Sequence, residues 1–183
     1  MSWYARSLSS LLHPSQSRVY VHATSDRSVG SQCIPLSRSK RPVVKWVGLQ
    51  SVRAERDVVV SWAECGYWVG IVTGGLSGVV VVDYDHTDVL PVDDTLVVRT
   101  PNGFHAYYRH PGGLVSTVGG VRPGVDVRGD GGVVVAAGNP GYEVVCGSWD
   151  ALGVLPGWVP RRGSVRRRVR AGATMSVSSF VIV

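Results

Sequence analysis

Two aspartates, Asp83 and Asp85, stand two residues apart at the end of the apolar run Val79-Val80-Val81-Val82. In a strand, side chains two positions apart point to the same face, so both carboxylates would project together. Neighbouring carboxylates repel each other, and a bound divalent cation is a common way to compensate that repulsion. The same spacing also fits an aspartate that starts a loop and a second one that caps it. The pair therefore suggests a metal site only if other residues support it.

A second group of side chains suited to charged ligands lies between Phe104 and Arg109. Read as a strand, this segment points His105, Tyr107 and Arg109 to one face and its apolar residues to the other. A histidine and an arginine that project together from a sheet suit an anionic ligand such as a triphosphate. The alternative is an ordinary solvated sheet face, which the segment alone does not exclude.

A third acidic position lies in the segment Val125-Asp126-Val127-Arg128. The flanking valines favour a strand, in which Asp126 and Arg128 share a face. Asp130, inside Gly129-Asp130-Gly131-Gly132, is typical of a turn residue instead. An ion pair between Asp126 and Arg128, or with another arginine, is the alternative to metal binding.

Together, the three segments would supply carboxylate oxygens for hard cations and basic side chains for phosphates. If their faces line one cleft, they could support two-metal nucleotidyl transfer. One cation would lower the pKa of an attacking 3′-hydroxyl, and the other would hold the triphosphate and offset charge on the departing pyrophosphate. Two metals held by carboxylates also serve hydrolysis, so a metal-dependent nuclease remains open.

The elements that would position these residues are mostly strands. The spacing predicts one helix over 53–67, ended by Gly66, with one face made of Val58, Trp62 and Cys65. Strands are predicted over 69–73 and over 79–85, the second central and mostly buried, and an edge strand is predicted over 141–145. Two hairpins are predicted, 96–100 with 104–109 and 125–128 with 133–137, separated by a loop over 110–124. The first connector contains Asn102-Gly103, which suits positive φ angles. The fold class is therefore mixed α/β (α+β).

Length and composition give the broad organisation. The chain has 183 residues, enough for one domain with a core, and a formal net charge of +6, which favours polyanion partners. We expect a poorly patterned segment over 1–30, a catalytic domain over 31–159 and an Arg-rich tail outside the fold over 160–183. Such a tail is either a solvated charge run or a source of non-specific DNA affinity through counterion release. Three scattered cysteines and the absence of a long apolar run indicate a reduced, cytoplasmic protein without a membrane span.

The ordered set of motifs resembles a known family. The chain is similar to the N-terminal domain of bifunctional DNA primase-polymerases, a branch of the archaeo-eukaryotic primase superfamily common in phages and plasmids. The resemblance covers roughly residues 33–145. It rests on Lys40-Arg41-Pro42 and Trp46, Gly70-Ile71-Val72-Thr73-Gly74, Ser77-Gly78, Val80-Val81-Val82-Asp83-Tyr84-Asp85, Arg99-Thr100-Pro101-Asn102-Gly103-Phe104-His105 and Val125-Asp126-Val127-Arg128-Gly129-Asp130-Gly131-Gly132.

The resemblance implies a role for each motif. The acidic pair Asp83 and Asp85 and the later Asp126 would bind Mg²⁺ or Mn²⁺, and His105 would contact the phosphates of the incoming nucleotide. The implied fold is a mixed, mainly antiparallel RRM-like sheet flanked by helices, with the site in a cleft upon it. To these residues we add Lys40, Arg109 and Arg128 as phosphate or template contacts, an expectation that comes from their charge and not from the family.

The resemblance also implies partners and has limits. The expected partners are a DNA template, nucleoside triphosphates and a separately encoded replicative helicase, since large members continue into a helicase and this chain does not. The expected location is the cytoplasm of a bacterial or archaeal host. Residues 1–30 do not match the family well, and residues 136–140 match only loosely. A non-catalytic nucleic-acid-binding accessory protein of replication is therefore the other reading beside the nuclease.

Overall fold

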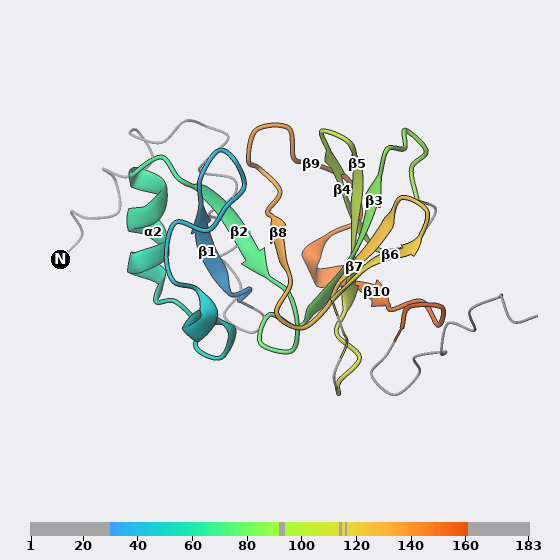
Figure 1. Ribbon diagram of the computed structural model, residues 1–183, viewed down its shortest axis with the longest axis horizontal. Coiled ribbons are helices and arrows are strands. Elements are labelled where there is room, and N and C mark those ends of the chain that lie inside the picture. Colours follow the sequence, from blue (N-terminus) through green and yellow to red (C-terminus); the bar gives the residue numbers. More distant parts are fainter. Residues whose placement is uncertain (1–29, 92–93, 114, 116, 161–183) are drawn as a thin grey trace, which may run out of the picture.

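A computed structural model describes residues 30–91, 94–113, 115 and 117–160 (Figure 1). The expected N-terminal segment and Arg-rich tail lie outside these residues, except for Gly30 and Pro160 at their inner ends. The helical elements are η1 (Val47–Gln50), α2 (Arg56–Glu64) and η2 (Trp149–Ala151). The strands are β1 (Cys33–Leu36), β2 (Trp68–Val72), β3 (Val79–Asp85), β4 (Leu96–Thr100), β5 (Gly103–Arg109), β6 (Val118–Arg122), β7 (Val125–Arg128), β8 (Val133–Val135), β9 (Glu143–Cys146) and β10 (Gly153–Val154).

The strands form two sheets. The larger sheet has the order β6-β7-β3-β5-β4-β9, with β10 added parallel to β5, and every other pairing in it is antiparallel. The smaller sheet has the order β1-β2-β8 and is antiparallel throughout. In Figure 1, α2 lies on the outer side of the smaller sheet, next to β1. The expected mixed, mainly antiparallel α+β fold is confirmed, with one α-helix in the described part of the chain.

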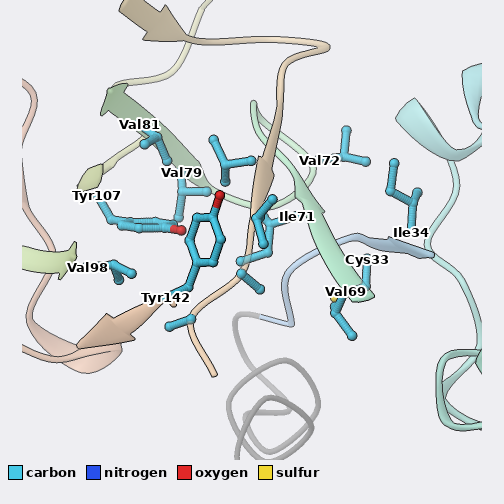
Figure 2. Packing of buried hydrophobic residues seen from close by; sticks show 14 of the residues in the cluster. Cys33, Ile34, Val69, Ile71, Val72, Val79, Val81, Val98, Tyr107 and Tyr142 are labelled. Carbon is cyan, nitrogen blue, oxygen red and sulfur yellow. The ribbon is translucent and has the colours of Figure 1, made fainter. Parts of the chain in front are cut away.

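The central strand β3 is buried on both faces. Its four valines are fully buried, and they alternate between two apolar clusters: Val79 and Val81 pack in one, Val80 and Val82 in the other. The first cluster fills the space between the sheets, where Figure 2 shows Ile71 and Tyr107 from opposite sheets around Tyr142. Burial on both faces explains why the sequence here is continuously apolar.

The helix is shorter than expected, and a different face is buried. Val59 is buried and Trp62 packs against the first cluster, whereas Val58 and Cys65 are exposed. Spacing alone could not decide whether Val58 or Val59 is buried, because both lie close to Trp62 on a helical wheel. The predicted stop is confirmed: Gly66 has φ +75°, and the next N–H, that of Tyr67, donates to the Trp62 carbonyl at 3.2 Å.

The hairpin of β4 with β5 is confirmed, but its connector differs from the prediction. Pro101 and Asn102 make the turn, and neither Asn102 nor Gly103 has a positive φ. Gly103 is needed for space instead, because a Cβ there would lie 2.0 Å from the carbonyl oxygen of Tyr84 on β3. The strands β3 and β5 therefore approach closely at this end.

The second predicted hairpin is wrong. Strand β7 pairs with β3 and β6 in the larger sheet, whereas β8 pairs with β2 in the smaller one. The connector around Asp130 thus carries the chain from one sheet to the other. The partner of β7 is β6, which lies inside the segment predicted as a loop, where repeated glycines concealed the strand pattern.

None of the described helices is long and apolar enough to cross a membrane.

Candidate metal centre

The pairing of β3 with its two neighbours assembles the site. Asp83 is directly opposite His105 on β5 and directly opposite Asp126 on β7. Because directly paired residues point to the same face, all three side chains stand in one row across three strands. Backbone register, and not the loops, therefore sets the arrangement.

Asp85 completes the acidic cluster from the end of β3. Its N–H donates to the Gly124 carbonyl at 2.8 Å, and its pairing partner on the other side is Gly103. Carboxylate oxygens of Asp83, Asp85 and Asp126 lie within 4.8 Å of one another. The convergence expected from the sequence is thus present in the structure. We call these three residues the acidic cluster.

Arg128 bridges two members of the acidic cluster. Its Nη2 donates to Asp126 Oδ2 at 2.9 Å and to Asp83 Oδ2 at 3.2 Å. Burial is the largest influence on Asp83 and raises the pKa of its carboxyl, and the charge of Asp126 raises it further. The positive charge and the hydrogen bond of Arg128 oppose that rise. The ion pair that the sequence offered as the alternative to metal binding is therefore formed, and it coexists with the converging carboxylates.

His105 lies on the other side of Asp83. Its Nε2 is 3.4 Å from Asp83 Oδ1, and its side chain is only 8% exposed. Burial, followed by the charge of Arg128, lowers the pKa of His105 to about 3, so the imidazole is neutral at neutral pH. Its Nδ1 is buried without a hydrogen-bond partner among the described residues. A neutral ring can donate a hydrogen bond without adding charge to the site.

A cleft of about 450 Å³ opens beside these residues, within the size range of ligand sites. Asp83, Asp85, His105, Arg128 and Lys40 line it, whereas Asp126, the third member of the acidic cluster, is not among its lining residues. Lys40 adopts a positive φ of 63°, which is uncommon for a residue with a side chain, and its Nζ lies 5.6 Å from the ring centre of Tyr142. The lining of the cleft thus combines the carboxylates of Asp83 and Asp85 with two basic side chains.

Two predicted positions behave differently from the rest. Arg109, at the far end of β5, is not among the residues lining the cleft, and its Nη2 donates to the Leu152 carbonyl at 3.3 Å. Tyr107 is fully buried in the apolar cluster between the sheets. The face shared by His105, Tyr107 and Arg109 is therefore not a continuous cationic surface, because the smaller sheet covers its middle.

Sequence reasoning missed several residues of the cleft. Tyr142 lies in the cleft wall with its ring centre 5.8 Å from that of His105, and no local pattern indicated it. Thr100 and Asn102 precede His105 in the same motif, at the turn between β4 and β5, and could have been inferred from the hairpin. Thr117 comes from the segment predicted as a loop.

The donor set of the acidic cluster fits a hard divalent cation. All three side chains offer carboxylate oxygens, which Mg²⁺ and Mn²⁺ prefer, and their spacing lets one ion or a pair of ions be shared between strands. Three carboxylates face one guanidinium and one neutral imidazole, so the cluster keeps an excess of negative charge. That excess is what a bound cation would neutralise.

The fold and site define a class of protein that carries a cluster of carboxylates, with basic side chains beside it, on an antiparallel sheet. Residues 25–158 match the family model described as "Bifunctional DNA primase/polymerase, N-terminal". The match spans more than half of the chain, and the chain therefore belongs to this family. No curated protein sequence matches it. Family membership supports a function of the DNA primase or polymerase type, with DNA and nucleotide substrates and metal dependence.

Proposed function

We propose that the protein performs template-directed nucleotidyl transfer, making or extending DNA by a two-metal mechanism in phage or plasmid replication. The observation that carries the proposal is the row His105–Asp83–Asp126, with Asp85 beside it. Three of these residues, Asp83, Asp85 and His105, line the cleft of about 450 Å³. Three carboxylates whose oxygens lie within 4.8 Å of one another, next to basic groups, are suited to holding cations and a triphosphate together.

Each site residue has a role that follows from its position. Asp83, Asp85 and Asp126 would hold Mg²⁺ or Mn²⁺. Cations bound there would lower the pKa of the attacking 3′-hydroxyl and offset charge on the departing pyrophosphate. His105 would donate a hydrogen bond to a phosphate oxygen from its neutral ring, and Arg128 would add a charged donor.

A basic turn at the mouth of the cleft is suited to the template or to the triphosphate. Ser37 N–H donates to the Arg41 carbonyl and Lys40 N–H to the Ser37 carbonyl, both at 2.8 Å, so the turn is well fixed. Arg38, Lys40, Arg41 and Lys45 are exposed, and no acidic residue lies between them. Phosphate groups are the natural partners of such a surface.

The test is a synthesis assay with the full chain. A labelled primer on a template, nucleotides and Mg²⁺ or Mn²⁺ should give longer products, and the isosteric variant Asp83→Asn should give none while its thermal unfolding stays cooperative. Asp150→Asn is the matched control, because Asp150 is exposed and does not line the cleft. Synthesis by Asp83→Asn at the wild-type rate would refute the site.

The same assay separates the other readings. Shorter products that require the metal and Asp83 would indicate a nuclease, since the same acids can activate water. DNA binding with neither longer nor shorter products would indicate a non-catalytic accessory protein. A replicative helicase supplied by another gene is the partner we propose for the active form.

A further inference from the structure

The carboxylates of Asp83 and Asp126 already have donors. Asp126 Oδ1 accepts from the Gly120 N–H at 2.6 Å, and its Oδ2 accepts from Arg128 at 2.9 Å. Asp83 Oδ2 accepts from Arg128 at 3.2 Å, while its Oδ1 faces His105 Nε2 at 3.4 Å. A cation that uses both carboxylates must therefore compete with at least one existing donor.

Only one of those donors can leave without deforming the sheet. Gly120 offers a backbone N–H from the β6–β7 hairpin, and His105 is held almost fully buried between strands and Tyr142. Arg128 is different, because its side chain is 32% exposed, lines the cleft and has several rotatable bonds. It also carries the positive charge that a bound cation would repel.

We propose that Arg128 is the resident counter-cation of the acidic cluster, and that cation binding displaces its guanidinium from Asp83 or Asp126 into the cleft. The inference rests on the proposed function, because it concerns the same acids. Before a metal binds, Arg128 holds β3 and β7 together at their acidic positions. After displacement, the freed guanidinium faces the space that a triphosphate would occupy, so metal binding prepares the nucleotide site.

The structure also predicts how Arg128 differs from the other cleft cation. Lys40 acts on Asp83 through its charge alone and makes no hydrogen bond to the acidic cluster among the described residues. Removing Lys40 therefore removes only a longer-range electrostatic attraction between its ammonium group and the metal-free carboxylates. Removing Arg128 removes two hydrogen bonds, at least one of which a cation must otherwise break.

The experiment measures Mn²⁺ binding to the full chain without nucleotide or DNA, by calorimetry or by the spin resonance signal of free Mn²⁺. Arg128→Gln should bind Mn²⁺ about tenfold more tightly than the wild type, because Mn²⁺ no longer has to break a charge-assisted hydrogen bond in order to bind. Arg128→Lys, which keeps the charge, should lie between the two. Lys40→Gln should change the affinity by about twofold or less, and Asp83→Asn should lose most of the binding.

Thermal unfolding supplies a second readout. In EDTA, Arg128→Gln should unfold at a lower temperature than the wild type, because the acids lose their counter-cation. With saturating Mn²⁺ that difference should shrink. An Arg128 that is merely structural would instead lower the unfolding temperature equally with and without Mn²⁺.

The failures are distinguishable. If the wild type binds Mn²⁺ but Arg128→Gln binds it no more tightly than Lys40→Gln does, the displacement is refuted and the metal site stands. If Arg128→Gln does not fold in EDTA, Arg128→Lys decides, and an affinity at or below that of the wild type refutes the displacement. Absence of Mn²⁺ binding in every variant would overturn the metal site and the proposed function together.

Discussion

The close approach of β3 and β5 at Gly103 gives the sharpest prediction of the structure. A Cβ at this position would lie 2.0 Å from the Tyr84 carbonyl oxygen and 3.0 Å from its carbon, whereas ordinary contact begins near 3.4 Å. Both neighbours are backbone atoms, so no side chain can rotate away. Gly103→Ala must therefore separate the two strands by about 1 Å at the pair formed with Asp85.

The cost follows from what that separation breaks. Overpacking a rigid site costs about 1–3 kcal/mol, and each lost ladder hydrogen bond adds about 1 kcal/mol. The bond from His86 N–H to the Asn102 carbonyl, 2.7 Å long, adjoins the strained pair and would lengthen. We expect Gly103→Ala to lower the free energy of unfolding by about 3 kcal/mol. Asp85 would move with its strand, so Mn²⁺ affinity should fall as well.

Urea unfolding followed by tryptophan fluorescence measures the first effect, and Mn²⁺ titration measures the second. Gly48→Ala is the matched control, because nothing lies within 4 Å of a Cβ there and η1 tolerates alanine. The control should be as stable as the wild type or slightly more so. If Gly103→Ala were as stable as Gly48→Ala and bound Mn²⁺ normally, the reasoning from strand proximity to site geometry would be wrong.

Three further predictions concern stability and DNA binding. Burial of Asp130 opposes its ionisation, but hydrogen bonds from Gly75 N–H, Val115 N–H and the His110 ring outweigh this and lower the pKa of its carboxyl. The ionised Asp130 therefore contributes to the free energy of unfolding above its unfolded pKa of about 3.9, and that contribution is lost as the pH falls through the folded pKa. Asp130→Asn should therefore cost about 1–2 kcal/mol at pH 7, and the difference from the wild type should shrink in urea melts below about pH 4. Val82→Ala, at a fully buried position of β3, should cost about 2–3 kcal/mol in the same melts. The double variant Arg38→Gln, Arg41→Gln should weaken single-stranded DNA binding and reduce the slope of log affinity against log salt by at most about 1.4, measured by fluorescence anisotropy.

The valine and arginine predictions each have a control variant within the chain. Val144→Ala, on the exposed edge strand β9, should change stability by about 0.5 kcal/mol or less. Arg53→Gln should leave the salt slope nearly unchanged, because its Nη2 is engaged with the Leu76 carbonyl at 2.7 Å. A constant difference for Asp130→Asn from pH 7 to pH 3 would contradict the assigned hydrogen bonds, and an unaltered salt slope for the double variant would remove the basic turn from the DNA contact surface.

The sequence predicted correctly those features that depend on the alternation of side chains along a single strand. Alternation along a strand placed Asp83 with Asp85, and Asp126 with Arg128, on common faces, and the run of four valines indicated a central strand. These inferences need only the two-residue repeat of a β-strand. The convergence of the three acids also required the pairing of β3 with β7, which spacing did not indicate; the resemblance implied only that the three acids share one site.

The sequence was misleading where contacts between segments that are far apart in the sequence determine the structure. Nothing local distinguishes a tight hairpin from a crossover, so β7 and β8 were expected to pair although they belong to different sheets. Arg109 shares a face with His105, yet the smaller sheet covers the middle of that face. Gly103 was assigned to turn geometry, and its actual constraint is a neighbouring strand that is far away in the sequence.

The alternation of valine and aspartate in β3 also bears on how the sheet finds its correct pairing. A slip of β3 by one residue would turn Asp83 towards the apolar cluster that holds Phe104 and Val127, and would turn Val82 towards the cleft. A carboxylate without a partner in such surroundings costs several kcal/mol, far more than a mispaired valine. The same acids that we assign to cation binding therefore penalise misaligned strands during folding. A chain in which these acids are replaced by apolar residues would lose this energetic penalty on misaligned pairing together with the proposed cation ligands.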